Sequence, residues 1–98
     1  MSASTLNLTA LLSTDELTWD RDDWVDHYQE GCADTYASSV IWASDDNALL
    51  ATVDLEALLR HHGADIEELR AELGGLINAG HTVLDLRHAG QALRFLGY

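Results

Sequence analysis

The sequence contains no proline and no lysine, and it has a single cysteine, Cys32. One cysteine cannot form a disulfide within the chain, so we expect a reducing compartment, with cytoplasmic localisation as the default. No stretch of about 18 or more apolar residues occurs, so we expect no membrane-spanning helix. The opening residues, MSASTLNLTALL, lack the basic leader and the small-residue cleavage site of a secretory signal, so we expect no secretion.

Positive charge is scarce, since five arginines stand against 17 acidic residues and the net charge is −12 at pH 7. The chain has 98 residues, of which 47% are hydrophobic, and this predicts one globular domain and not a disordered acidic tail. Residues 1–56 contain twelve of the acids and only Arg21, whereas residues 57–98 contain five acids and four arginines. This distribution indicates one acidic region on a nearly neutral base. Adaptation of the whole surface to salt would spread the acids more evenly, although the absence of lysine fits it.

The acidic region has a pattern typical of a helix that begins after Asp20, and this helix would extend to about Ala43 or break at Gly31. Aromatic and apolar residues recur every four positions and would share a buried face. They are Trp24, Tyr28, Cys32, Tyr36 and Val40. Carboxylates with the same spacing would form a row on the opposite face. They are Asp22, Asp26, Glu30 and Asp34. Trp19 and Trp42 lie outside the aromatic face, and one of them is a candidate for an exposed interface anchor.

The next segment predicts short elements. Residues 43–47, ASDDN, indicate a turn. Residues 48–54, ALLATVD, predict either a brief strand or the start of the helix that follows. Asp54 would cap that helix and Gly63 would stop it.

The C-terminal part predicts a helix followed by a β-hairpin. Asp65 would cap the helix and Gly80 would end it. Residues 81–88 then alternate as a strand does, and a turn at residues 89–91 would lead into a second strand, ALRFLGY. The apolar stripe of the helix comprises Ile66, Leu69, Leu73, Leu76 and Ile77. The residues that we expect to be buried here are Leu69, Leu73, Ile77, Val83, Leu93 and Phe95.

The order of these elements in residues 53–98 resembles a winged helix-turn-helix domain. The resemblance rests on the ending, in which a helix, Ala-Gly, a strand, a glycine turn and a second strand follow one another. It implies an α+β fold, a mostly helical small domain with a winged-helix-like C-terminal half. The single domain would then consist of an acidic N-terminal part with a long helix, residues 1–47, and the winged-helix-like part, residues 48–98.

Direct binding to nucleic acid is not expected. The helix that reads the major groove in winged-helix proteins would here carry mainly acidic side chains. Its polar residues are Glu67, Glu68, Arg70 and Glu72. Affinity for DNA depends largely on lysines and arginines, so DNA would repel this chain unless a local cluster of arginines formed. The arginines available for such a cluster are Arg60, Arg70, Arg87 and Arg94.

The sequence also lacks the spacings of known catalytic and metal-binding motifs. Its five histidines show no HExxH or CxxC-type arrangement, and the adjacent His61 and His62 would point about 100° apart on a helix. Cys32 lies between Glu30 and Asp34, an electronegative setting that disfavours a thiolate nucleophile. We therefore expect no enzymatic activity, no cofactor and no metal.

Small size, strong acidity and the lack of catalytic motifs resemble phage anti-CRISPR and other anti-defence inhibitors, in composition only. The resemblance implies a small acidic interaction protein that inhibits a nucleic-acid-binding complex. Its carboxylates would mimic phosphates and occupy the basic groove of that complex, without contact to nucleic acid or membrane. The candidate partner-binding residues are Asp15, Glu16, Asp20, Asp22, Asp23, Asp26, Glu30, Asp34, Asp45 and Asp46. The alternatives are an immunity or antitoxin protein that neutralises a basic toxin, a winged-helix transcription regulator and a face that serves only solubility; a homodimer also stays open.

Overall fold

The computed structural model describes residues 11–31 and 35–98, and in these residues the regular elements are all helices. A 3-10 turn, Glu16–Thr18, precedes α1, Arg21–Asp26, which continues directly into a π-helical turn, His27–Gly31. The four further helices are α2, Thr35–Trp42; α3, Thr52–His61; α4, Ile66–Asn78; and α5, Ala89–Phe95. None of the helices in the described part of the chain combines the length and the apolar composition needed to cross a bilayer.

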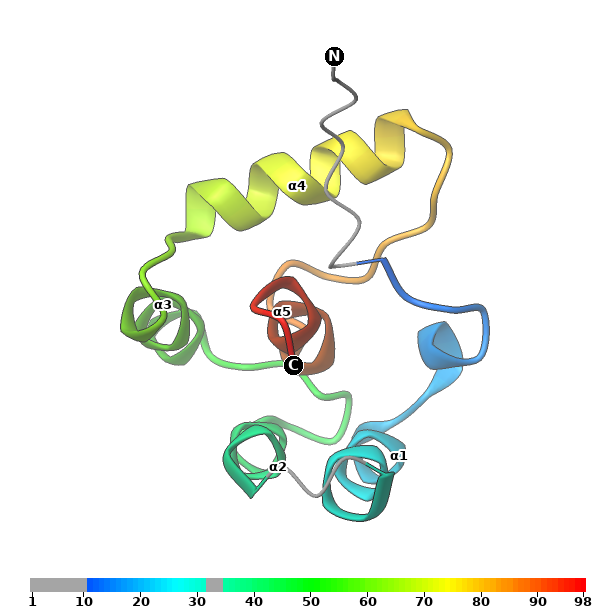
Figure 1. Cartoon of the computed structure of the whole chain (residues 1–98), viewed down its shortest axis with the longest axis vertical. Helices are drawn as coiled ribbons and strands as arrows, with labels where there is room; N and C mark the ends of the chain where they lie inside the picture. The colour runs from blue at the N-terminus through cyan, green and yellow to red at the C-terminus, as the bar shows by residue number, and fades with distance from the viewer. Residues whose placement is uncertain (1–10, 32–34) are drawn as a thin grey trace.

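Helix α5 forms the centre of the fold. Figure 1 shows it surrounded by α1, α2 and α3, with the longer α4 running across one side. Residues 89–93 of α5 are all buried, including the small residues Ala89, Gly90 and Ala92. A short helix that is buried on every side is typical of a core position, and its small side chains let neighbouring elements approach its backbone.

The β-hairpin predicted for residues 81–98 is wrong. Residues 89–91, predicted as its turn, form the first turn of α5. Within the described residues, β pairing is limited to a single antiparallel bridge between Leu49 and His88. The domain is therefore helical; it is not α+β and has no winged-helix hairpin.

The side chain of Gln91 explains why this segment needs no partner strand. It is fully buried, and its Nε2 donates to the carbonyl oxygens of Leu84 at 3.2 Å and Asp85 at 3.1 Å. Its Oε1 accepts from the backbone N–H of Leu84 at 2.8 Å. At the start of α5, Nδ1 of His88 accepts from the backbone N–H of Gln91 at 3.2 Å. One side chain thus satisfies backbone groups of the loop that would otherwise require a neighbouring strand.

Within residues 20–43, the structure describes helical segments on both sides of residues 32–34, which lie outside the described part of the chain. The π-helical turn ends at Gly31, the residue at which a break was one of the two expectations, and α2 begins at Thr35. A π-helical turn replaces the usual hydrogen bonds by bonds between residues five apart, so it changes the angular period of the chain. The faces predicted for one continuous helix therefore do not extend unchanged from α1 to α2.

The aromatic face is confirmed in α1 and in part beyond it. Trp24 and Tyr28 are 0% and 1% exposed and belong to the core, as expected. Val40 is partly buried, but Tyr36 is 39% exposed, so its predicted burial is wrong. Cys32 lies outside the described residues.

Four of the predicted helix boundaries are confirmed, the first of them at Asp20, which caps α1. Asp65 caps α4 through a reciprocal capping box. Gly63 and Gly80 follow the ends of α3 and α4 with φ angles of +78° and +92°. Glycine adopts this left-handed conformation without the steric penalty of other residues, which explains why it stops both helices.

The start of α3 differs from the prediction. Of the two alternatives for residues 48–54, the start of a helix is correct from Thr52 onward. Ala51 occupies the cap position, so Asp54 lies in the first turn of α3 and does not cap it. A carboxylate in a first turn still interacts favourably with the helix dipole.

The predicted core of the C-terminal part is confirmed at three of its six positions, since Leu69, Leu73 and Leu93 are buried. Val83 and Phe95 are partly buried, whereas Ile77 is 57% exposed, so its predicted burial is wrong. Helix α4 contacts the core along one narrow face, and Ile77 projects about 100° away from the buried Leu76.

Candidate protein interaction surface

The carboxylates predicted to bind a partner occupy different environments. The exposed ones are Asp15, Asp20, Asp22, Asp23, Asp26, Asp45 and Asp46. Glu16 is turned inward, with a side chain that is only 13% exposed. The side chain of Glu30 and the whole of Asp34 lie outside the part of the chain that the structure describes. Because the π-helical turn follows Asp26, the spacing of four residues does not by itself continue a straight row beyond that residue.

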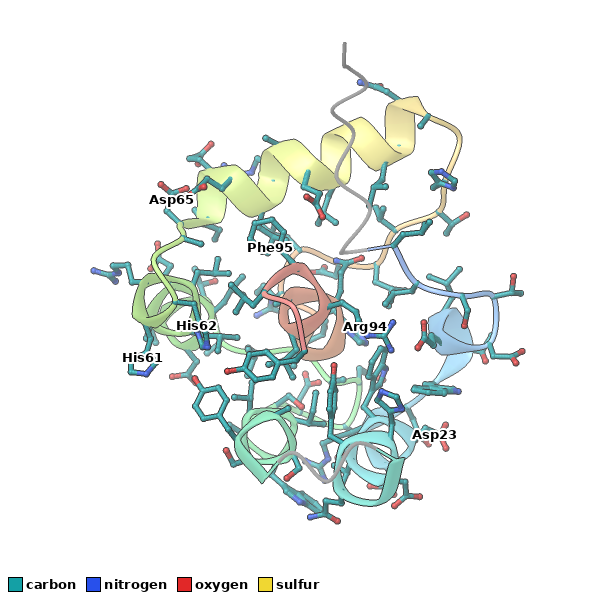
Figure 2. The ribbon with its side chains drawn as sticks, viewed as in Figure 1. Asp23, His61, His62, Asp65, Arg94 and Phe95 are labelled. Carbon is teal, nitrogen blue, oxygen red and sulfur yellow. The ribbon has the colours of Figure 1, made fainter. Side chains whose placement is uncertain are left out.

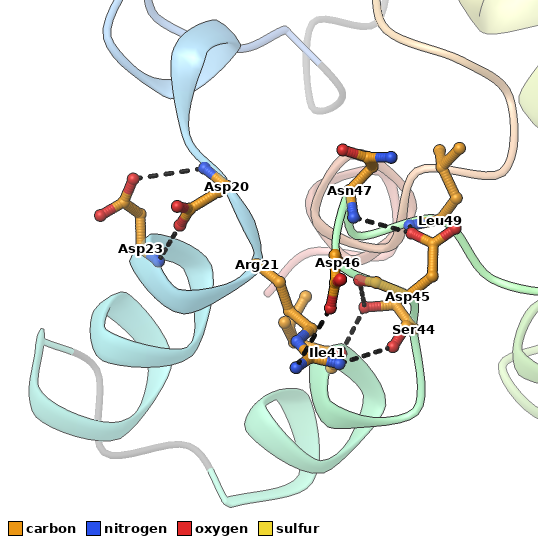
Figure 3. A network of polar contacts seen from close by, with 9 residues as sticks. All are labelled: Asp20, Arg21, Asp23, Ile41, Ser44, Asp45, Asp46, Asn47 and Leu49. Atoms are coloured by element: carbon orange, nitrogen blue, oxygen red, sulfur yellow. Dashed lines mark hydrogen bonds and ion pairs between the residues drawn. The ribbon is translucent and has the colours of Figure 1, made fainter.

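Asp20 and Asp23 are fixed at the start of α1 (Figure 3). Oδ1 of Asp20 accepts from the backbone N–H of Asp23 at 3.0 Å, and Oδ2 of Asp23 accepts from the backbone N–H of Asp20 at 3.2 Å. This reciprocal capping box satisfies backbone donors that the start of a helix leaves without an intrahelical partner. Both carboxylates therefore stabilise the fold, whatever else they contact.

Asp22 and Asp26 lie one helical turn apart on α1, and both are exposed. Their axial separation is about 6 Å at 1.5 Å per residue. Among the described residues, the structure shows no hydrogen bond or ion pair to either carboxylate. Both carboxylates therefore direct their negative charge to solvent.

Arg21 joins α1 to the turn that follows α2 (Figure 3). Its Nη1 donates to the carbonyl oxygen of Ser44 at 3.1 Å, and its Nη2 lies 3.7 Å from Oδ1 of Asp46. The guanidinium also lies over the ring of Trp42, at 5.3 Å from the centroid, and Trp42 is 51% exposed. Of the two tryptophans considered as interface anchors, Trp42 is therefore the exposed one, while Trp19 is partly buried.

The contact of Arg21 brings together carboxylates that are distant in the sequence. A surface hollow of about 160 Å³ is lined by Asp20, Arg21, Asp22 and Asp46. One guanidinium therefore stands among three carboxylates, and the hollow keeps an excess of negative charge. We call Asp20, Asp22, Asp23, Asp26 and Asp46 the acidic surface.

Asp45 adjoins the acidic surface but is engaged in its own turn. Its Oδ1 accepts from the backbone N–H groups of Asn47 at 2.8 Å and Leu49 at 2.9 Å (Figure 3). These hydrogen bonds, above all that from Leu49, lower the pKa of Asp45 below its ordinary value. Asp45 therefore stays ionised and holds the turn that presents Asp46.

Glu16 does not belong to the acidic surface, because it pairs with Arg94 of α5. Nη1 of Arg94 donates to Oε1 of Glu16 at 3.1 Å, and Nη2 contacts Oε2, so the pair is bidentate. Figure 2 shows Arg94 extending from α5 toward the segment that carries Glu16. Burial alone would raise the pKa of Glu16, but the hydrogen bond from Arg94 helps to bring the pKa below its ordinary value. This ion pair tethers the N-terminal segment to the central helix.

A second hollow, of about 360 Å³, lies on the other side of α1. It is lined by Trp19, Asp23, Asp26 and His27. The ring of Trp19 lies 4.9 Å from that of Trp24 in an edge-on arrangement and 5.4 Å from that of His27. Burial, followed by the nearby charge of Arg94, lowers the pKa of His27 below its ordinary value. Both effects disfavour the protonated form of His27.

The histidines form no metal centre within the described residues, since no group of three or more candidate ligands occurs there. His62 has a structural position: its Nδ1 lies 2.9 Å from the carbonyl oxygen of Leu58, and its Nε2 lies 2.8 Å from the hydroxyl of Tyr98. His61 is exposed beside it on α3 (Figure 2).

Sequence reasoning missed the contact from Arg21 that groups the acidic surface and the contact from Arg94 that removes Glu16 from it. Arg21 and Ser44 are 23 residues apart, and Glu16 and Arg94 are 78 residues apart. Pairings over such distances leave no signal in local spacing. Comparison with known proteins adds no assignment, since no family model, no curated protein and no solved structure matches the chain.

Proposed function

We propose that this protein inhibits a nucleic-acid-binding protein or complex by occupying its basic groove with the acidic surface. The observation that supports this proposal is the grouping of Asp20, Asp22 and Asp46 around the single cation Arg21. Asp22 and Asp26 extend the negative charge along α1. Lysines and arginines that normally hold phosphates would pair with these carboxylates.

The internal energetics of α1 favour a role beyond solubility. Like charges four residues apart, such as Asp22 and Asp26, destabilise a helix by about 0.2–0.5 kcal/mol. A face needed only for solubility can mix positive and negative side chains and avoid this cost. Here the described part of α1 contributes only Arg21 as a cation, and that residue is engaged with Ser44 and Asp46. The retained repulsion is consistent with selection for binding a positive partner.

Inhibition would proceed by competition and would require no chemical step. Complementary charge makes association fast and strongly dependent on ionic strength. Among nucleic-acid-binding machines, the effector complexes of CRISPR systems are the partner class that we propose, on the compositional resemblance to anti-CRISPR inhibitors.

The proposal is tested by affinity capture from lysates of candidate host cells, using the wild-type chain and the variant Asp22→Lys/Asp26→Lys. We expect the wild-type chain to retain a nucleic-acid-binding protein that is released by salt and displaced by DNA or RNA. The double variant should retain none of it. A matched control is Glu56→Lys/Glu67→Lys on α3 and α4, which changes the net charge equally at positions away from the acidic surface.

Three results would contradict the proposal. One is equal capture by the wild-type chain and by Asp22→Lys/Asp26→Lys. Another is equal loss of capture in the control pair, because net charge and not the acidic surface would then be responsible. The third is capture of a basic toxin that has no nucleic-acid-binding site, because this result would identify an immunity protein.

A further inference from the structure

An apolar groove separates α2 from α3. Its volume is about 380 Å³. One wall comprises Tyr36 and Val40 of α2 with Ala43, which directly follows α2. The wall from α3 comprises Asp54, Ala57, Leu58 and His61. Leu50, which is 2% exposed, also lines the groove. Both helices pack against α5, and in Figure 1 they stand apart on neighbouring sides of it.

The groove has the length and the spacing of lining residues that suit the binding of a helix. Tyr36, Val40 and Ala43 fall at positions i, i+4 and i+7, and the lining residues of α3 at i, i+3, i+4 and i+7. Each wall is therefore one continuous helix face about 10 Å long, at 1.5 Å per residue. The ring of Tyr36 stacks on that of His61 at 6.4 Å, so the start of α2 adjoins the end of α3 and the two helices are antiparallel. Two turns of an amphipathic helix would match these walls.

The two ends of the groove differ in charge. One end has the stacked rings of Tyr36 and His61. At the other end, the exposed Asp54 lines the groove together with Ala43. Asp45 and Asp46 follow Ala43 within three residues, and Asp46 is in contact with Arg21 of α1. The turn that presents Asp46 to Arg21 thus follows directly in the chain after Ala43, which lines the groove.

We infer that this groove binds an amphipathic helix of the partner protein, with apolar side chains between α2 and α3 and a lysine or arginine at Asp54. The inference rests on the proposed function, because the same positive partner would contact the acidic surface and the groove together. A second copy of the chain is the less favourable occupant, since each copy carries a net charge of −12 and two copies repel. Charge complementarity thus selects a cationic helix.

The direct test uses the full chain labelled with ¹⁵N and three synthetic helical peptides of about 15 residues, a length at which isolated helices become marginally stable. The first peptide carries leucines at i, i+4 and i+7 with lysines beside them. The second replaces the lysines by glutamates, and the third replaces the leucines by serines. We expect the first peptide to shift the amide signals of Val40, Ala57 and Leu58. The second should not bind, and the third should shift only signals of the acidic surface.

Matched variants separate the groove from the rest of the surface. Ala57→Glu introduces a carboxylate into the groove, and Ala71→Glu makes the same change at an exposed position of α4. We expect Ala57→Glu to weaken binding of the first peptide by about tenfold or more, equivalent to about 1.4 kcal/mol. Ala71→Glu should leave it unchanged. Asp54→Asn should weaken it several-fold, more at low salt than at high salt.

Several outcomes would overturn the inference. The inference fails if the first peptide binds only at α1, or if the glutamate peptide binds equally well. It also fails if Ala57→Glu does not change the binding of the first peptide. Self-association of the chain that is abolished by Ala57→Glu would assign the groove to a second copy. If the groove inference fails while Asp22→Lys/Asp26→Lys still abolishes partner capture, the proposed function stands without the groove. If neither set of variants changes partner capture, both fail.

Discussion

Gly90 of α5 packs directly against the indole ring of Trp24 of α1. A Cβ atom added to Gly90 would lie 2.6 Å from two atoms of that ring, a distance that side-chain contacts do not tolerate. Trp24 is fully buried and is also in edge-on contact with the ring of His88, at 5.6 Å. The ring therefore cannot move aside without disturbing its other neighbours. The glycine at this position sets how closely α1 approaches the central helix.

The first prediction concerns this contact. Gly90→Ala should destabilise the fold by about 1–3 kcal/mol, because the added methyl group overpacks a filled core. Chemical denaturation of both proteins measures the difference. The control is Gly74→Ala in α4, where an added Cβ meets nothing within 4 Å. That variant should be more stable by about 0.5–1 kcal/mol, since alanine is favoured over glycine within a helix. Equal stability of the two variants would contradict the packing described for Trp24.

The second prediction concerns the ion pair between Glu16 and Arg94, whose side chains are 13% and 20% exposed. Glu16→Gln should lower the free energy of unfolding by about 1–3 kcal/mol, because it leaves a largely buried guanidinium without its charged partner. The comparison is Glu67→Gln, which removes an ion pair to Arg70 whose side chains are 72% and 57% exposed. Exposed pairs contribute about 0–1 kcal/mol.

The ion pair also predicts a dependence on pH. The pKa of Glu16 in the folded chain is below its ordinary value of 4.5. Its contribution to stability is therefore complete above about pH 4.5 and is lost as the pH falls through the folded value. The Glu16→Gln variant should lack this part of the acid-induced loss of stability. An unchanged pH profile would show that Glu16 is not paired in solution.

The third prediction concerns His88. Burial, only partly opposed by the charges of Asp85 and Asp45, lowers its pKa from 6.5 to about 4. The unfolded chain takes up a proton at this residue near pH 6.5, whereas the folded chain does so only near pH 4. Stability should therefore fall as the pH is lowered from 6.5 to 4, by at most about 3 kcal/mol from this residue. Asparagine can also cap a helix, so His88→Asn should flatten this slope even if it weakens the core. A slope identical to that of the wild type would contradict the prediction.

The fourth prediction separates the structural carboxylates of α1 from those that we propose to bind a partner. Asp20→Ala should lower stability by about 1 kcal/mol, because it removes the helix cap. Asp26→Ala should leave the melting temperature unchanged or raise it slightly, since it relieves repulsion with Asp22. Thermal unfolding at low and moderate salt measures both variants. A large loss of stability in Asp26→Ala would show that this residue has a structural partner.

The fifth prediction concerns DNA. Three of the four arginines considered for a DNA-binding cluster are close to carboxylates of the chain itself. These are Arg94 beside Glu16, Arg70 beside Glu67 and Arg87 beside Asp85. We therefore expect no gel retardation of duplex DNA at micromolar protein and about 0.15 M salt. Tight, salt-sensitive retardation that is abolished by Arg70→Ala and Arg87→Ala would contradict this.

The candidate site was predictable only where it depends on composition or on residues that are neighbours in the sequence. The acidity of the N-terminal region is a property of composition and could be predicted. The grouping of Asp46 with Asp20 and Asp22 could not, because it depends on the contact between Arg21 and Ser44. For the same reason the sequence predicts Glu16 at the surface, although Arg94 holds it against α5.

The sequence by itself determined the features that depend on a few neighbouring residues. Asp20 and Asp65 cap their helices through hydrogen bonds to residues three positions away. Gly63 and Gly80 end helices because glycine accepts a positive φ angle. The burial of Trp24 follows from its spacing on an amphipathic helix.

Only the tertiary structure decided the conformation of residues 81–98. Their alternation of apolar and polar residues is typical of a strand, yet the loop is satisfied by the side chain of Gln91 and the remainder becomes the central helix. Because α5 is buried on nearly all sides, contacts with α1, α2 and α3 stabilise it as a helix, and these contacts outweigh local pattern. A backbone segment without strong local signals takes the conformation that best buries its apolar groups and provides hydrogen bonds for its polar ones. Residues far away in the chain set both conditions.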